Sequence, residues 1–380
     1  MNPNDNVRQI DQLTGLRAFL ALWVVTRHLF HPFENGAFID FGTRFLAFDQ
    51  GYLGVDGFFI LSGFILAYNY ANGRPLDYRA FVGARFARVY PVHFVTLLGA
   101  IGLVCIRHFV LHKHVIGTAQ NTYPALAANF VLLNAWSFDF VTGWNDVAWS
   151  VSAEWFAYVF FPLFVALAPA RNRLFAAVLL VVPAGALAAL EWHSATALSL
   201  PGGLARLIPE FYAGVLLFRL RRASAFATLP RMLGLAAIGI IALGIVVRHD
   251  TLTVIGLGLL IFGLSSNADF VAPLLAFRPI VYLGEISYCL YMVQRFPMEG
   301  LSIARKASAA LAGSPTMQVF VLLAMLFAAS HLTHRFIELP GRKWLRRVLS
   351  PRHVQPQAAT TFAPQTATGI MREQGEGSAT

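Results

Sequence analysis

An arginine and a histidine lie within one long apolar stretch of the sequence. Residues 13–33 are long and apolar enough to cross a bilayer as a helix, and they carry Arg17 near the start and His28 toward the end. Eleven residues at about 1.5 Å each separate the two by about 16 Å, roughly half the hydrocarbon thickness. Ionisable side chains at membrane depth usually face a polar interior and mark a functional path. Each residue alone also fits a structural role, Arg17 at the inner interface and His28 bonded to a neighbouring helix.

Two carboxylates from later apolar stretches are expected at the depth of His28. Asp56 lies in GYLGVDGFFILSGF and Glu154 in WSVSAEWF. An imidazole removes a proton from a hydroxyl most readily when a carboxylate fixes its tautomer and stabilises the imidazolium. His28 is therefore a candidate general base, with Glu154 or Asp56 as partner. Two alternatives stay open: Asp56 caps the helix that starts at Gly57, and Glu154 balances Arg206.

Three arginines are expected together near the opposite side of the membrane. Arg85 and Arg88 in RFARVYP stand three residues apart, on one face of a helix, with Arg17 at similar depth. Guanidinium groups suit phosphate oxygens because their fixed fork makes bidentate contacts. The alternative is ordinary anchoring at a positively charged inner face. Together, the residues suggest a phosphate-bearing ligand held from the cytoplasm and proton chemistry nearer the outside.

No metal site is predicted. His108, His112 and His114 have a possible ligand spacing near Cys105, but they fall at the outer end of a helix, where histidine is common at the interface. The sequence also lacks a phosphate-binding P-loop, a G-x-S-x-G elbow and a Cys-x-x-Cys pair.

The composition indicates an integral membrane protein. Of 380 residues, 57% are hydrophobic and 13% charged, and the mean hydropathy is +0.60. The net charge of +10 comes from arginines between the apolar runs, where they set topology and contact lipid headgroups. Nucleic-acid binding is not expected.

The apolar runs predict an all-α polytopic protein with about ten transmembrane helices. The arginine-rich connections fall on one side only if the short run 123–138 does not span, which places both termini in the cytoplasm. Residues 1–12 form a cytoplasmic segment, 13–345 one membrane domain, and 350–380, rich in Gln, Thr, Ala and Pro, a disordered cytoplasmic tail. The expected spans are roughly 13–32, 52–71, 89–110, 149–169, 174–190, 204–220, 231–247, 251–266, 279–297 and 315–337.

Seven sequence blocks in order resemble the membrane-bound acyltransferase 3 family, bacterial multispan O-acyltransferases. The resemblance covers about residues 10–345. The blocks are LTGLRAFLALWVVTRH with the family's Arg-x10-His, GYLGVDGFFILSGF, RFARVYP with its Arg-x-x-Arg, WSVSAEWF, RLIPEFYAGVLL, LGEISYCLYMVQ and FIELPGR. Many members end the sixth block with His, where this chain has Gln294. We expect this difference to leave the surroundings of His28 unaffected.

The resemblance implies transfer of an acyl group, usually acetyl from acetyl-CoA, to a hydroxyl of a carbohydrate or similar acceptor in the bacterial cytoplasmic membrane. Acetyl-CoA or another acyl-CoA is then a co-substrate, and no cofactor is bound permanently. His28 would deprotonate the acceptor or carry the acyl group briefly, with Arg17, Arg85 and Arg88 near the donor. Supporting polar groups are Ser150, Ser152 and Tyr288, as possible oxyanion donors, and Arg206.

Two other interpretations stay open at this point. Intramembrane Arg, His and Glu also build transporters or flippases for saccharides and lipid-linked intermediates. The second alternative keeps the acyltransferase but changes the acceptor to a macrolide or a lipid, since the sequence motifs do not identify the acceptor.

Overall fold

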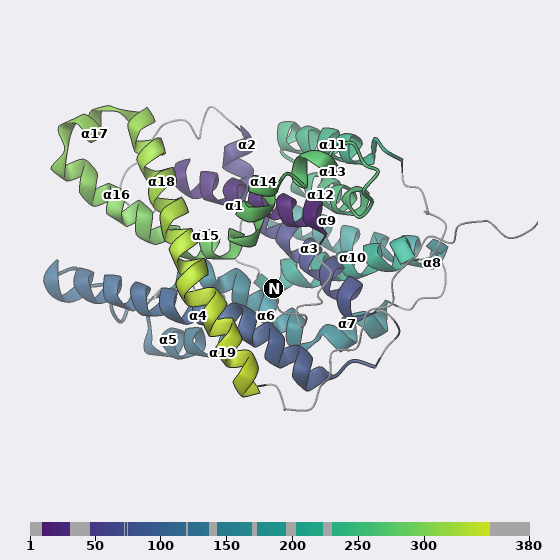
Figure 1. The fold of residues 1–380 in the computed structure, drawn as a ribbon, viewed down its shortest axis with the longest axis horizontal. Helices are drawn as coiled ribbons and strands as arrows, with labels where there is room; N and C mark the ends of the chain where they lie inside the picture. The colour runs from purple at the N-terminus through teal and green to yellow at the C-terminus, as the bar shows by residue number, and fades with distance from the viewer. Residues whose placement is uncertain are drawn as a thin grey trace, which may run out of the picture.

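The computed structural model describes residues 10–30, 46–71, 73, 75–118, 121–136, 143–168, 173–194, 203–222 and 230–349. The expected cytoplasmic segment 1–12 lies largely outside these residues, and the expected disordered tail 350–380 lies wholly outside them. In the described ranges the chain forms helices and turns without a β-strand, which confirms the all-α prediction (Figure 1).

The helices fall into a group around the candidate site and a surrounding group. Around the site lie α1 (Asp11–Phe30), α3 (Leu53–Tyr70), α4 (Tyr78–Cys105), α6 (Trp149–Val159), α10 (Gly203–Arg222) and α15 (Ser287–Val293). The others are α2 (Leu46–Asp49), α5 (Tyr123–Phe130), α7 (Phe161–Leu167), α8 (Arg173–Leu179), α9 (Val181–Ser194), α11 (Leu233–Val247), α12 (Asp250–Leu264), α13 (Ala272–Leu275), α14 (Arg278–Glu285), α16 (Arg295–Ala307), α17 (Ala309–Gly313), α18 (Pro315–Thr333) and α19 (Leu339–Leu349). Short 3-10 turns occupy Gln50–Tyr52 and Asp146–Ala148, and π-helical turns occupy Ile106–Val110 and His334–Glu338.

Four helical segments are long and apolar enough to cross a membrane. They are Leu46–Tyr70, Tyr78–Val110, Leu174–His193 and Pro315–Leu349, and α6 with α7, bent by 63°, makes a fifth if the pair counts as one span. Helix occurs within all ten predicted spans, but the count of ten and the side of each terminus stay predictions. In residues 123–138 the helix α5 has 8 residues, about 12 Å, which is too short to span a bilayer.

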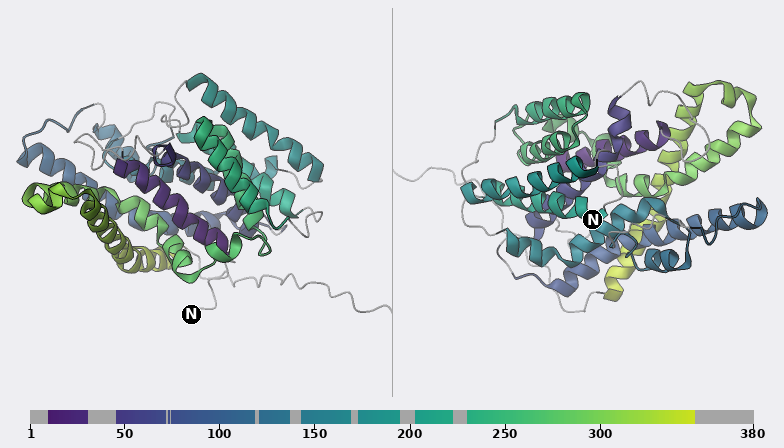
Figure 2. Two further views of the ribbon diagram at one scale, coloured as in Figure 1. Left: turned by 90° about the horizontal axis from the view of Figure 1, so that it is seen from above. Right: turned by 180° about the vertical axis from the view of Figure 1, so that it is seen from behind.

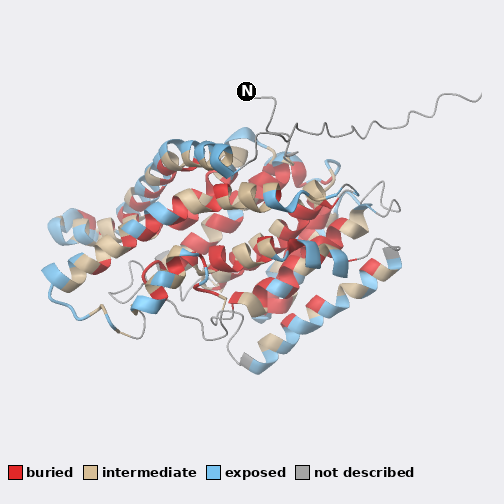
Figure 3. Ribbon diagram, turned by 90° about the horizontal axis from the view of Figure 1, so that it is seen from below, coloured by how far each residue is buried: buried red, intermediate tan, exposed pale blue. Residues whose placement is uncertain are grey.

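The apolar helices differ in how much of their surface the protein buries. In the apolar window of Leu46–Tyr70, 72% of the residues are buried, against 17% for Leu174–His193 and 22% for Pro315–Leu349. Figure 3 shows the same arrangement, with buried residues on the central helices and exposed ones on the periphery. Apolar helix surface that the protein leaves uncovered is stable against lipid, so the exposed apolar faces of these peripheral helices fit a membrane protein.

Helix α3 packs against both α1 and α10 in the middle of the molecule (Figure 2). The α3–α10 crossing depends on two glycines. A Cβ on Gly63 would lie 2.1 Å from the Phe211 carbonyl oxygen, and one on Gly214 would lie 2.1 Å from that of Ile60. Small residues let helix backbones approach this closely in a membrane. The close crossing brings the polar groups of α3 and α10 within contact of each other.

Candidate functional site

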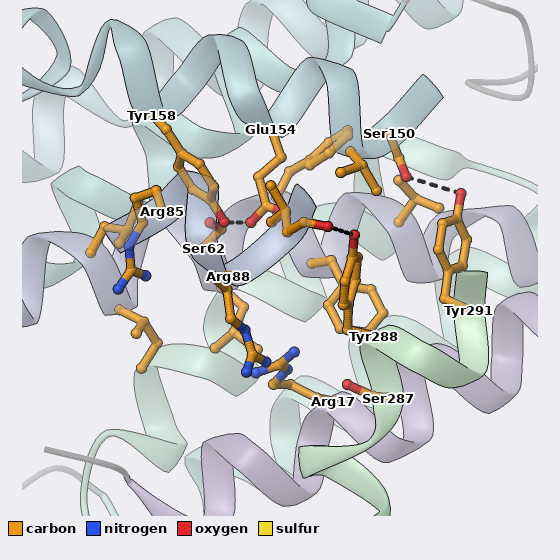
Figure 4. Close-up of a pocket in the computed structure, with 18 residues that line it drawn as sticks. Arg17, Ser62, Arg85, Arg88, Ser150, Glu154, Tyr158, Ser287, Tyr288 and Tyr291 are labelled. Atoms are coloured by element: carbon orange, nitrogen blue, oxygen red, sulfur yellow. Dashed lines mark hydrogen bonds between the residues drawn. The ribbon is translucent and has the colours of Figure 1, made fainter. Parts of the chain in front are cut away.

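A cavity of about 160 Å³ lies where α1, α3, α4, α6 and α15 meet (Figure 4). Aromatic and aliphatic side chains form part of its wall. The polar side chains that line it are Arg17, Ser62, Arg85, Arg88, Ser150, Glu154, Tyr158, Ser287, Tyr288 and Tyr291. The structure thus brings together the three predicted arginines and the predicted Ser150, Glu154 and Tyr288.

Helical periodicity explains how each helix presents its polar groups to this cavity. On α6, Ser150, Glu154 and Tyr158 are spaced four residues apart, so they share one face. On α4, Arg85 and Arg88 are three apart and also share a face. The cavity is therefore built from single faces of amphipathic segments within otherwise apolar helices.

The three arginines have different partners. Arg88 makes an ion pair with Glu338 (Nη1 to Oε1, 2.6 Å). Arg85 donates to the Tyr70 hydroxyl at 3.3 Å and lies 5.5 Å from the centre of the same ring. Within the part of the chain that the structure describes, no ion pair joins Arg17 or Arg85 to a carboxylate. Figure 4 shows Arg17 and Arg88 pointing toward the same end of the cavity. Two of the three guanidinium groups are thus available to an anionic ligand.

The Glu338 carboxylate anchors Arg88 from behind the cavity wall. Glu338 is fully buried, and its Oε2 lies 2.8 Å from His334 Nδ1 and accepts from Cys289 Sγ at 3.1 Å. Carboxylate, imidazole and thiol groups this close can ligate a metal ion, and these three lie within 4.8 Å of one another. The Arg88 guanidinium already supplies the positive charge at this carboxylate, so we interpret the cluster as a support for Arg88.

Glu154 contacts a hydroxyl rather than the histidine it was expected to orient. Ser62 Oγ donates to Glu154 Oε1 at 2.6 Å inside the cavity. Glu154 therefore shares one cavity with the three arginines, and the predicted separation into two depths stays a prediction. The alternative that Glu154 balances Arg206 is wrong, since Arg206 pairs with Asp56.

Asp56 is committed to Arg206 and lies outside the described cavity lining. Arg206 Nε donates to Asp56 Oδ1 at 3.1 Å, and Nη2 contacts Oδ2. Both residues are buried, and the guanidinium also lies 5.5 Å from the Trp149 ring centre. Asp56 is not a cap at Gly57 either, because α3 begins at Leu53. The pair joins α3 to α10, so the structure gives Asp56 a structural contact in place of the predicted one with His28.

His28 contacts Gln294, the position where this sequence departs from the family pattern. His28 Nδ1 lies 3.0 Å from Gln294 Oε1, and Gln294 is 1% exposed. The expectation that this difference leaves the surroundings of His28 unaffected is therefore wrong. His28 is not among the described residues that line the cavity. However, Tyr291 does line it and precedes Gln294 by three residues, so about one helical turn connects the cavity wall to the residue that contacts His28.

The three predicted oxyanion donors have separate environments. Ser150 Oγ donates to the Tyr291 hydroxyl at 2.9 Å, and Tyr291 donates in turn to the Val147 carbonyl at 2.9 Å. The Tyr288 hydroxyl donates to the Val89 carbonyl at 2.7 Å while lining the cavity. Ser152 lies outside the described lining and is fully buried, and its hydroxyl donates to the Leu132 carbonyl at 2.7 Å. Ser152 therefore holds α6 to the preceding turn, and only Ser150 and Tyr288 face the cavity.

Sequence reasoning missed several residues of the site. Tyr158 follows Glu154 by four residues, and Tyr291 follows Tyr288 by three, so helical spacing could have identified both. Glu338 belongs to the FIELPGR block, but nothing in the sequence pairs it with Arg88.

Fold and site together describe a helical membrane protein with an arginine-lined cavity next to a histidine. Comparison with known proteins identifies its class. The family profile described as an acyltransferase domain (acyltransferase 3) matches residues 10–335, and the chain belongs to this family. The protein is therefore an acyltransferase, as expected from the resemblance, and the family match gives no support to the transporter interpretation.

Three known proteins are similar to this chain in sequence. Acyltransferase MdmB of Streptomyces mycarofaciens is 28% identical over 399 residues, covering 94% of this chain and 98% of the relative. A putative peptidoglycan O-acetyltransferase, YrhL, of Bacillus subtilis is 28% identical over 192 residues, covering 46% of this chain and 27% of the relative. Protein 2 in the picA locus of Rhizobium radiobacter is 37% identical over 100 residues, covering 25% of this chain and 46% of the relative. No solved structure matches significantly.

Proposed function

We propose that this acyltransferase uses an acyl-CoA, most simply acetyl-CoA, as donor and binds its phosphates at Arg17, Arg85 and Arg88. The observation that carries the proposal is that three guanidinium groups line one cavity, and Arg17 and Arg85 make no ion pair with a carboxylate in the described ranges. An unpaired cation below the protein surface is costly unless a ligand supplies the opposite charge. The phosphates of CoA meet this need, and its thin pantetheine arm suits a narrow passage between helices.

His28 is the proposed general base. The helix α1 runs unbroken from Asp11 to Phe30, so Arg17 and His28 are about 16 Å apart along its axis. A donor held by its phosphates at Arg17 then extends its thioester toward His28. The acceptor oxygen forms a C–O bond to the acyl carbon as the C–S bond breaks, and the hydroxyl proton passes through His28 to the CoA sulfur. A brief acyl-histidine intermediate is the alternative route.

The proposed acceptor is a carbohydrate-type hydroxyl, such as that of a surface polysaccharide. Support comes from the partially matching relative of Bacillus subtilis, which is named a putative peptidoglycan O-acetyltransferase. The relative that matches along its whole length is named only as an acyltransferase, so macrolide and lipid hydroxyls belong in the acceptor panel. We place the protein in the bacterial cytoplasmic membrane, with the arginine end of the cavity open to the cytoplasm.

The test uses inverted membrane vesicles that contain either the unmodified protein or His28→Ala. Labelled acetyl-CoA is added outside, and label is followed into saccharide, lipid-linked saccharide and added acceptors. Transfer by the unmodified protein alone would support the donor, the side of entry and the role of His28. Equal transfer by His28→Ala would refute the role of His28. Folded protein that neither binds nor consumes acyl-CoA would refute the proposed donor.

A further inference from the structure

The contact between His28 and Gln294 joins the first helix of the chain to a break between two late helices. Gln294 stands between α15, which ends at Val293, and α16, which begins at Arg295. Its amide oxygen lies 3.0 Å from His28 Nδ1, and its amide nitrogen has no hydrogen-bond partner among the described residues. A buried amide that leaves one group unsatisfied has a free-energy cost, so its presence here calls for an explanation.

Three side chains of α15 fix the position from which Gln294 reaches His28. Tyr288 bonds to Val89 on α4, Cys289 bonds to Glu338, and Tyr291 bonds to both Ser150 and Val147. Each contact goes to a different part of the chain. The end of α15 therefore cannot rotate without breaking several buried hydrogen bonds, and the amide is held in place against the imidazole.

An amide whose oxygen faces Nδ1 favours the Nδ1–H tautomer of a neutral imidazole, and His28 also has a backbone hydrogen bond to Val24. If the amide oxygen accepts the hydrogen on Nδ1, the lone pair of the ring lies on Nε2. We propose that Gln294 is the positioning residue of His28, holding the Nδ1–H tautomer so that Nε2 is the atom that takes the acceptor proton. The inference rests on the proposed function of His28 as base. An amide fixes the tautomer without adding a charge, so the proton taken up by Nε2 is not held by a carboxylate and passes on readily to the leaving sulfur.

The charged groups around His28 are already engaged. Asp146 on the 3-10 turn and Arg27 on α1 act electrostatically on the imidazole. Asp146 pairs with Arg295 at 2.9 Å, and Arg27 pairs with Asp49. Neither pair uses the Gln294 side chain, so a change in pH dependence is expected to report the loss of the amide itself.

Three variants test the inference in purified protein reconstituted with acyl-CoA and the best acceptor of the panel. Gln294→Leu removes the hydrogen-bond acceptor and should lower kcat by about 10- to 100-fold, with an unchanged KM for acyl-CoA. Gln294→Glu keeps an acceptor but stabilises the imidazolium. It should recover rate at high pH and move the acid limb of the kcat profile upward by on the order of one pH unit. Gln318→Leu is the matched control, because Gln318 is also a buried glutamine, but its amide donates to the Leu311 and Ala312 carbonyls.

The outcomes separate this inference from the function on which it rests. The expected result is a kcat loss in Gln294→Leu, a pH-dependent rescue in Gln294→Glu, and an unshifted profile in Gln318→Leu. A normal kcat in Gln294→Leu, or equal loss in both Gln294 variants at every pH with acyl-CoA binding intact, would overturn the positioning role. If His28→Ala transfers normally, the proposed function of His28 fails instead.

Discussion

Replacing Arg17 by glutamine should weaken acyl-CoA binding without destabilising the protein. Arg17 lines the cavity and has no ion pair within the described ranges, so the ligand phosphate is its expected partner. A hydrogen bond to a charged group contributes roughly 1.5–3 kcal/mol. At about 1.4 kcal/mol per tenfold change, the loss predicts a rise in Kd of about 10- to 150-fold.

The assay compares acetyl-CoA with acetyl-pantetheine, which carries the same thioester without phosphates. Calorimetric titration of the purified protein gives a Kd for each ligand. Arg17→Gln should raise the Kd for acetyl-CoA and leave the Kd for acetyl-pantetheine nearly unchanged, because the missing contact is to phosphate. Arg27→Gln is the matched control on the same helix, since Arg27 pairs with Asp49 and is not among the described lining residues.

A thermal unfolding measurement completes the test. Loss of a partly buried cation without an ion pair removes part of a desolvation cost, so the unliganded Arg17→Gln protein should be at least as stable as the unmodified one. An equal rise in Kd for both ligands, or no rise for either, would refute the assignment of Arg17 to phosphate binding. A large fall in unfolding temperature would show instead that Arg17 has a structural role.

Two further predictions concern the scaffold of the site. Glu338→Gln removes the charge that pairs with Arg88 and should destabilise the protein by about 3–5 kcal/mol, measured as a lower unfolding temperature in detergent; an unchanged temperature would show that the pair is dispensable. Gly214→Ala should cost about 1–3 kcal/mol in the same assay, because its Cβ would lie 2.1 Å from the Ile60 carbonyl oxygen. Gly102→Ala, with nothing within 4 Å of the added Cβ, should be neutral or slightly stabilising, and equal losses in both alanine variants would contradict the crossing argument.

The sequence was sufficient to predict where the helices lie along the chain, but not which helices contact each other. Long apolar runs predict helices because a bilayer requires backbone hydrogen bonds within each segment, and helix occurs within all ten predicted spans. The same runs give depth along the membrane normal. They do not show which helix each face contacts. That depends on close packing between segments far apart in the sequence, such as Gly63 of α3 against Phe211 of α10.

The position of Asp56 outside the cavity shows that depth along the membrane normal does not predict which face of a helix a residue occupies. On α3, Val55 and Ser62 are seven residues apart and both line the cavity. At about 100° per residue, Asp56 is turned by roughly 120° from Ser62, toward α10. The heptad spacing could have predicted that Asp56 and Ser62 occupy different faces. That the second face meets Arg206 required the three-dimensional arrangement.

The partner of His28 follows from how charges are compensated in a low-dielectric interior. An ionised carboxylate in the interior is stabilised by a cation that is always charged, and a histidine supplies one only when it is protonated. Asp56 and Glu338 are accordingly paired with Arg206 and Arg88. If His28 is the general base, as proposed, an uncharged amide is the better match for its neutral imidazole, because the amide fixes the tautomer without holding the proton. Gln294 supplies this amide from 266 residues away, at a break between helices that apolar periodicity alone does not reveal. The sequence analysis favoured a carboxylate because a carboxylate fixes the tautomer and stabilises the imidazolium; in the structure Glu154, Asp56 and Glu338 have other partners.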